Sequence, residues 1–279
     1  MALPPVIARF LPERFAKSSP VVTHVRLQGA IGMGSPLRPG LNFKDVEPLL
    51  QRAFSRKGIA AVALSINSPG GSTVQSALIA SRIRQLAEKH KVPVLVFCED
   101  VAASGGYWLA CAGDEIHADE SSIVGSIGVI AASFGFVDAL SKLGIERRVH
   151  TAGENKSILD PFQPEKEEDV ERLLAIQGDV HQAFKALVRS RRAGKLKGDE
   201  AELFSGAFWA GREALARGLI DGIGHLHGVL ASRFGPKLVL KSITPSSGWM
   251  LKRLGFAASA GEGLVDALET RALFRRFGL

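Results

Sequence analysis

The chain contains 279 residues, of which 46% are hydrophobic and 23% are charged, and these proportions are ordinary for a soluble globular protein. Its net charge of +7 arises from 35 basic and 28 acidic residues, which is mild for this length. The composition argues against a nucleic-acid partner, because there is a single Tyr and no aromatic residues alternate with the basic runs.

Hydropathy and cysteine content indicate the compartment. The sequence has no apolar run of about 18 residues, and its N-terminus lacks the apolar core of a signal peptide. We therefore expect a cytoplasmic protein that is neither exported nor membrane-spanning. Cys98 and Cys111 lie in apolar segments without a CxxC spacing, which predicts two buried thiols in a reducing compartment.

The first hundred residues alternate apolar strands with amphipathic helices. Residues 1–20 are predicted to form a polar arm that contains prolines. Strands are predicted at 21–31, 59–67 and 92–99, and helices at 44–54 and 73–90. This alternation is typical of an α/β fold with a mainly parallel sheet flanked by helices.

The remaining elements are predicted from the same periodicities. They are a loop running into a helix at 101–110, a short strand within 114–130, a helix near 133–143, a strand near 145–151, an amphipathic helix at about 165–192, and a strand or turn with a short helix within 199–224. The tail carries a candidate helix near 262–277, which packs on the surface, docks on a neighbouring subunit or lies on a membrane.

Two glycine-bearing loops follow successive strands, NSPGGS at 67–72 and EDVAASGG at 99–106. Ligands bind at this edge of open α/β sheets. Two backbone N–H groups, one from Gly105 and one from Gly70 or Gly71, would hold the oxyanion that develops in acyl transfer. The alternative is that these glycines serve tight turns and close strand–helix packing.

Four segments carry a family resemblance: SINSPGGS, the buried strand after it, AASGGYW and VGSIGV. In this order they resemble the signal peptide peptidase A (protease IV) family of serine peptidases, most closely its short, SohB-like branch. The resemblance implies a Clp/crotonase-like domain at 21–235, between an N-terminal arm at 1–20 and a helical C-terminal extension at 236–279. It implies that Ser104 is the nucleophile and that Ser126, a competing serine, shapes the site beside it.

The base is not evident from the histidines. Clp-type proteases carry a histidine about two dozen residues after the serine, and here that window holds none. His225 and His227 lack a third ligand, so no metal site is predicted, whereas a Ser-His-Asp triad stays open because triads assemble in space. GENKSILDPF resembles the family's lysine segment, which implies Lys156 as the base. The adjacent Ser157 would hydrogen-bond the amine and orient it, or its hydroxyl would cap a turn. A lysine is protonated at neutral pH, so this role requires an apolar site that favours the neutral amine.

These features predict a serine endopeptidase with a Ser–Lys dyad that needs no cofactor. Its substrates would be signal-peptide remnants or other short or unfolded peptides, cleaved through an acyl-enzyme. Asn67 is expected to fix the first loop by side-chain-to-backbone bonds. The resemblance further implies a ring-like homo-oligomer, in which the lysine of one subunit reaches the serine of the next.

Two other functions stay open. A crotonase-type acyl-CoA enzyme uses the same paired N–H groups but needs no Ser–Lys pair. A catalytically silent scaffold would bind partners or the inner face of a membrane through its basic C-terminal runs at 249–254 and 270–277.

Overall fold

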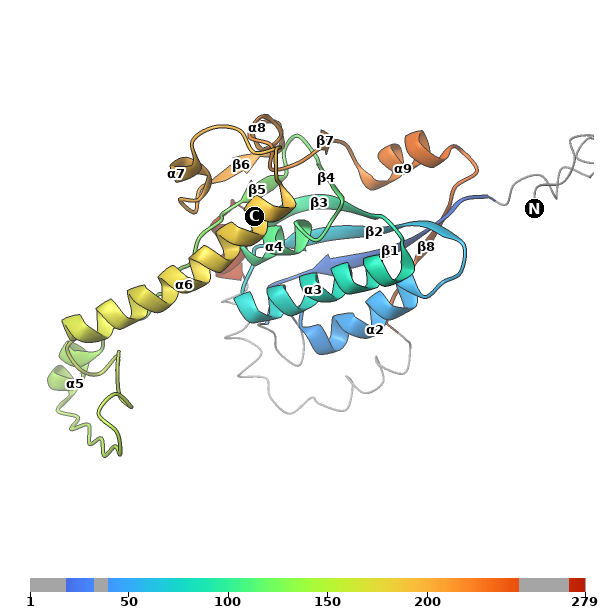
Figure 1. Cartoon of the computed structure of the whole chain (residues 1–279). Helices are drawn as coiled ribbons and strands as arrows, with labels where there is room; N and C mark the ends of the chain where they lie inside the picture. Colours follow the sequence, from blue (N-terminus) through green and yellow to red (C-terminus); the bar gives the residue numbers. More distant parts are fainter. Residues whose placement is uncertain (1–18, 33–39, 246–270, 279) are drawn as a thin grey trace, which may run out of the picture.

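A mainly parallel sheet forms the centre of the fold (Figure 1). The computed structural model describes residues 19–32, 40–245 and 271–278. The strands are β1 (Val21–Gln28), β2 (Ile59–Ser68), β3 (Val94–Ala103), β4 (Glu115–Ala118), β5 (Ile123–Gly125), β6 (Phe208–Ala210), β7 (Gly222–Ile223) and β8 (Val239–Ser242).

The strand order confirms the predicted fold class. The path is β6-β5-β3-β2-β1-β8, and β4 joins β3 to β7. Pairing is parallel throughout this sheet except between β5 and β6. Because β8 pairs with β1, the sheet continues past residue 235, where the domain was expected to end.

Three helices cover one face of the sheet: α2 (Phe43–Phe54), α3 (Thr73–His90) and α4 (Gly105–Ala110). The predicted bounds of α3 are confirmed, because local signals set both ends. The Ser72 hydroxyl accepts a hydrogen bond from the Gln75 N–H and caps the start of the helix. Lys91 adopts a left-handed conformation after the last turn and ends it.

Apolar side chains fill both sides of the sheet. The larger cluster lies under α2, α3 and α4 and includes Leu64, Ile66 and Ile79, all fully buried. Each such side chain stabilises the fold by about 1.5–3 kcal/mol. The smaller cluster lies on the opposite face, where Leu230 of α9 (Leu226–Phe234) packs with strand residues such as Leu95. The continuous apolar strands of the sequence follow from this double cover.

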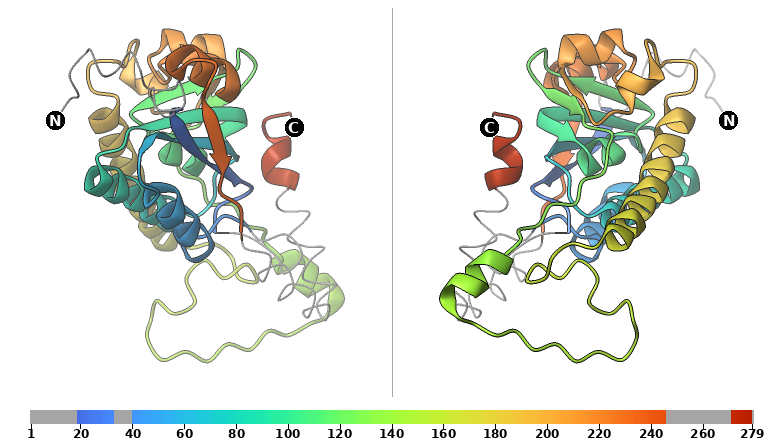
Figure 2. Two further views of the ribbon diagram at one scale, coloured as in Figure 1. Left: turned by 90° about the vertical axis from the view of Figure 1, so that its right-hand side faces the viewer. Right: turned by 90° about the vertical axis from the view of Figure 1, so that its left-hand side faces the viewer.

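A long arm projects from the sheet domain (Figures 1 and 2). It consists of α5 (Val137–Leu143), an irregular segment and the distal part of α6 (Glu167–Arg191). The strand predicted near 145–151 is wrong, because these residues are exposed and no described strand lies beside them to pair with. The long helix is confirmed, but only Phe184 and Val188, in its second half, are buried.

The remaining predictions concern short elements, the termini and the thiols. Residues 199–224 form α7 (Glu200–Leu203), β6, α8 (Gly211–Ala216) and β7. The C-terminal segment is helical at 271–275. Residues 1–18 of the expected N-terminal segment and residues 246–270 of the expected C-terminal extension lie outside the described residues. Cys98 and Cys111 are buried and unpaired, as predicted, and burial raises the pKa of each thiol to about 12. Among the described helices, none combines the length and the apolar character needed to cross a membrane.

Candidate active site

Ser104 occupies the turn between β3 and α4. Its backbone has φ +53° and ψ −122°, a conformation that residues with a Cβ rarely adopt. One tertiary and one helical hydrogen bond hold it there: the Ser104 N–H donates to the Gly125 carbonyl at 2.8 Å, and the Ser104 carbonyl accepts from the Trp108 N–H of α4 at 3.0 Å. A strained residue fixed from two sides is typical of a nucleophile presented on a sharp strand-to-helix turn.

The first glycine loop lies directly against this turn. A Cβ atom on Gly70 would approach the Gly105 nitrogen to 2.8 Å, so only glycine fits between the two loops. Gly71 is bracketed by Ile31, whose N–H donates to the Gly70 carbonyl and whose carbonyl accepts from the Ser72 N–H. In a parallel bridge of this kind, the N–H of Gly71 points away from Ile31.

The backbone donors near Ser104 differ in their availability. As the first residue of α4, Gly105 has an N–H without an intrahelical acceptor. The Gly70 N–H donates to the Ser68 hydroxyl at 3.2 Å. Among the described residues, neither the Gly105 nor the Gly71 N–H has a hydrogen-bond partner, whereas Gly70 serves the close approach of the two backbones.

A cavity of about 640 Å³ opens beside Ser104. Residues distant in the sequence line it, including Gly71, Ser104, Ser126, His181, Leu273 and Arg276. The C-terminal segment that contributes the last two is held by an edge-to-face contact of Phe277 with Phe208, with ring centroids 5.0 Å apart. The cavity is thus formed by both loops, the turn after β5, the helix α6 and the tail.

Of two predicted supporting residues, one shares the cavity with Ser104 and the other lies between the two strands that precede the loops. Ser126 lines the same cavity and is also held at φ +53°, with its N–H donating to the Ala207 carbonyl at 2.7 Å. The Asn67 carboxamide accepts from the Val101 N–H and donates to Asp100, so it joins β2 to β3 instead of bonding the backbone of its own loop.

Lys156 and Ser157 lie elsewhere in the single chain. Both are in the irregular segment between α5 and α6, where Lys156 is exposed and Ser157 is half-buried. Neither lines the Ser104 cavity. One chain thus brings together the serine and the backbone donors but not the predicted base.

His181 is a cavity residue that the sequence analysis did not select. It lies on α6, and one of its ring nitrogens, Nε2, is 3.1 Å from the Ile127 carbonyl oxygen. The spacing of His181, Phe184 and Val188 places it on the buried side of the helix, and this is the sequence signal that could have identified it.

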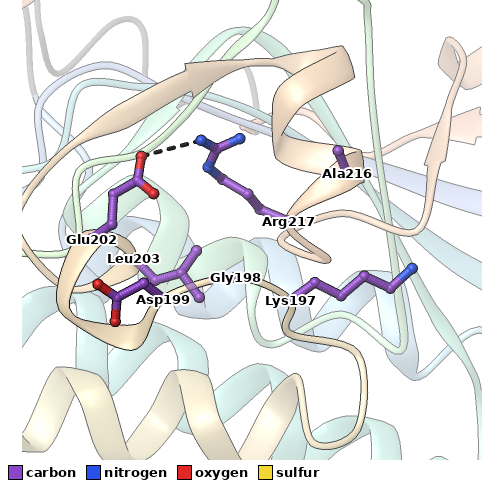
Figure 3. A pocket seen from close by; sticks show the side chains of 7 residues that line it. All are labelled: Lys197, Gly198, Asp199, Glu202, Leu203, Ala216 and Arg217. Carbon is purple, nitrogen blue, oxygen red and sulfur yellow. Dashed lines mark hydrogen bonds and ion pairs between the residues drawn. The ribbon is translucent and has the colours of Figure 1, made fainter.

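Two other cavities contain neither the strained Ser104 nor the glycine donors of this site. Figure 3 shows one of about 250 Å³ between α7 and α8, where Arg217 forms an ion pair with Glu202 at 3.1 Å. A polar cavity of about 710 Å³ lies near the start of α9 and includes His24, Glu99 and Asp119. Within the described residues, no group of three or more His, Cys, Asp or Glu side chains could hold a metal ion.

Comparisons with known proteins identify the family. The pattern of peptidase family S49 matches residues 86–233, more than half of the chain. The chain is 51% identical over its whole length to a Brucella abortus protein named Na(+)/H(+) antiporter NhaA, of which it spans 40%. It is also 35% identical to the chloroplastic serine protease SPPA of Arabidopsis thaliana. That match covers 67% of this chain and 27% of the relative.

A solved structure shares the fold. A lysine-to-alanine mutant of the 1510-N membrane-bound stomatin-specific protease, in complex with a substrate peptide, superposes with a TM-score of 0.53. The match covers 85% of this chain and 98% of that one at 15% identity, so it supports the Clp/crotonase-like architecture alone. The family match over more than half of the chain leads to one conclusion: this chain belongs to peptidase family S49, a family of serine peptidases.

Proposed function

We propose that this chain is a serine endopeptidase in which Ser104 attacks the peptide carbonyl and Lys156 of a neighbouring copy is the general base. One observation carries the proposal. At the carboxyl end of β3, a serine in a strained turn meets two available backbone donors, Gly71 and Gly105, at the edge of a cavity large enough for a peptide segment.

The chemistry follows from these positions. The neutral amine of Lys156 takes the hydroxyl proton as Ser104 Oγ bonds to the scissile carbonyl carbon. The N–H groups of Gly71 and Gly105 stabilise the resulting oxyanion, and each such donor contributes about 3–4 kcal/mol to the transition state. The ammonium then protonates the leaving amine, and a water molecule, deprotonated by the same lysine, hydrolyses the acyl-enzyme.

The exposure of the arm supports a base from a second copy. A lysine acts as a base only under apolar cover, and within one chain Lys156 faces solvent. Large apolar side chains on the same arm are also exposed, among them Leu143 (71%), Ile145 (54%) and Leu174 (59%). In a ring, the arm of one subunit would pack against the next subunit, which would bury these apolar residues. The Lys156 of the first subunit would then reach the Ser104 cavity of the second. Ser157 would then orient the amine.

The cavity suggests the kind of substrate. Val129 and Ile130 line it and are 36% and 67% exposed, so an extended peptide with apolar side chains would cover them. We expect short or unfolded peptides, including signal-peptide remnants, as substrates.

We place the protein in the cytoplasm, with peripheral contact at the inner face of the membrane. Arg271, Arg275 and Arg276 are exposed on one short C-terminal segment, which supports attraction to anionic headgroups. Cosedimentation with anionic vesicles, but not with neutral ones, is the expected result. Equal recovery with both would contradict this part of the proposal.

A fluorophosphonate probe tests the nucleophile. The wild type should be labelled on the peptide that contains Ser104, and Ser104→Ala should not be labelled. Lys156→Ala should react far more slowly and should lose about 10²–10⁴ in kcat/KM on a fluorogenic peptide. Labelling of Ser126 instead, or full activity of Lys156→Ala, would overturn the assignment.

Mixed assemblies test the origin of the base. Ser104→Ala and Lys156→Ala subunits are each inactive in this proposal, but when they are dissociated and reassembled together, some sites combine an intact serine with an intact lysine. Partial recovery of activity is expected on mixing. No recovery, with mixed assemblies verified by mass, would place both residues in one chain.

A further inference from the structure

The contact between His181 and Ile127 joins the long helix to the edge of the Ser104 cavity. The two residues are 54 positions apart, and the imidazole Nε2 lies 3.1 Å from the Ile127 carbonyl oxygen. A carbonyl oxygen only accepts, so Nε2 carries the hydrogen. Phe184 and Val188, one and two turns further along α6, are buried and hold the helix against the domain.

The segment that accepts this bond runs along the cavity from Ser126 to Ile130. It starts one residue after Gly125, whose carbonyl accepts from the Ser104 N–H. Its first part is constrained by the bond from the Ser126 N–H to Ala207 and by a tight turn in which the Gly128 N–H donates to the Ser126 carbonyl at 3.0 Å. Past Gly128, the next backbone donor with a partner among the described residues is Phe136.

His181 therefore supplies a side-chain hydrogen bond to the segment at Ile127, next to Gly128, where its backbone hydrogen bonds end. Ile127 is fully buried, and its carbonyl would lose its imidazole partner without this histidine. Ser126 is held at φ +53°, a conformation that persists only where the surroundings impose it. Val129 and Ile130, which line the cavity and are exposed, come directly after Gly128 in the same segment.

We infer that His181 is a positioning residue for peptide binding, because it fixes the Ser126–Ile130 segment along the Ser104 cavity. This inference rests on the proposed peptidase function and assigns that segment to substrate binding. The His181 Nε2 cannot accept the serine proton as a base, because it already carries a hydrogen that it donates to the Ile127 carbonyl. Both the imidazolium and the neutral tautomer with hydrogen on Nε2 keep this donor, so the tie needs no change of charge.

Three substitutions separate positioning from acid–base catalysis. The amide nitrogen of His181→Gln reaches about as far as Nε2 and donates without titrating. His181→Ala removes the donor, and the shorter amide of His181→Asn fails to reach Ile127 while it retains polarity. Gln182→Ala, at an exposed position one residue along the same helix, is the matched control.

The expected kinetic result is a change in KM. His181→Ala and His181→Asn should raise KM about tenfold, as expected when a buried carbonyl loses its partner, with kcat and the fluorophosphonate labelling rate changed less than about threefold. His181→Gln and the control should keep KM and the pH profile of the wild type. Loss of kcat in His181→Gln would make His181 an acid–base group and overturn the inference, as would an unchanged KM in His181→Ala and His181→Asn.

Hydrogen exchange provides a readout that needs no activity. In His181→Ala and His181→Asn, the hydrogen-bonded amides of Ser126 and Gly128 should exchange at least several-fold faster than in the wild type, whereas those of α3 should not change. If the wild type neither takes the probe nor cleaves peptide, the proposed function fails, but the exchange result still tests the tie. Unchanged exchange in both variants would overturn the positioning role.

Discussion

A Cβ atom on Gly70 would lie 2.7 Å from the Cβ of Ser104, closer than such atoms approach in folded proteins. The two loops that carry these residues are separated by α3 and β3 in the sequence but pack backbone against backbone at the candidate site. Glycine at position 70 is thus a condition for the position of Ser104 and of the Gly105 donor.

Gly70→Ala should reduce kcat/KM by about 100-fold or more, because a displacement near 1 Å at a reacting group has an effect of this size. Gly58→Ala is the matched control: Gly58 also has a positive φ, but its added Cβ would meet no atom within 4 Å. Both variants bear backbone strain, and only the first should lose probe labelling. Equal labelling of both would show that the close approach does not position Ser104.

Ser104→Gly should be more stable than Ser104→Ala by about 1 kcal/mol, because glycine adopts the conformation at φ +53° without the strain of a Cβ. Both variants lack the nucleophile, so the comparison isolates backbone strain from activity. Urea unfolding of the two proteins measures the difference. A glycine variant no more stable than the alanine variant would mean that the turn stores no strain.

Arg192→Leu should destabilise the fold by about 3 kcal/mol, because it removes the buried guanidinium that bonds the Asp221 carboxylate and the Gly218 carbonyl and leaves Asp221 paired with the more exposed Lys195. The Arg192 side chain is 2% exposed and lies 2.7 Å from Asp221, whose carboxylate also accepts from the Ile116 N–H. Burial alone would raise the pKa of Asp221, but the bonds from Arg192 and Lys195 outweigh it and hold the pKa at about 2.

The control is a pair of similar geometry on the surface. Arg212 lies 2.6 Å from Glu120, but the two side chains are 74% and 49% exposed. Arg212→Leu should therefore change the free energy of unfolding by less than about 1 kcal/mol. Similar losses in the two variants would contradict the dependence on burial.

His24 should make the protein less stable in mild acid. Burial lowers the pKa of its imidazole; Glu99 opposes this shift, whereas His227 and Arg26 add to it. The folded state therefore binds this proton less readily than the unfolded chain does. Stability is unaffected by His24 well above pH 6.5 and falls as the pH drops from there toward the lowered folded pKa, below which the loss is constant.

The test compares urea midpoints of the wild type and His24→Gln at pH 7.5 and pH 5. Glutamine does not titrate and can reach Ser65, which lies 2.9 Å from the His24 Nε2. The decrease in midpoint between the two pH values should be smaller in the variant. A decrease of equal size would assign the acid sensitivity to other groups.

Local signals in the sequence determined most of the sheet domain. Unbroken apolar runs indicated β2 and β3, and a serine cap together with helical periodicity set the bounds of α3. The order of the glycine loops placed Ser104, Gly71 and Gly105 at one edge, because parallel strands end on the same side of a sheet. Each of these conclusions depends on residues close together in the chain.

Only the tertiary structure decided what surrounds the serine. The segment 145–151 formed no strand, since pairing requires a neighbour that the described chain does not provide. His181 and Leu273 reach the cavity through the packing of α6 and of the C-terminal segment, and Lys156 lies outside it on the arm. These relationships depend on distances between segments that are far apart in the sequence, and local periodicity carries no information about such distances.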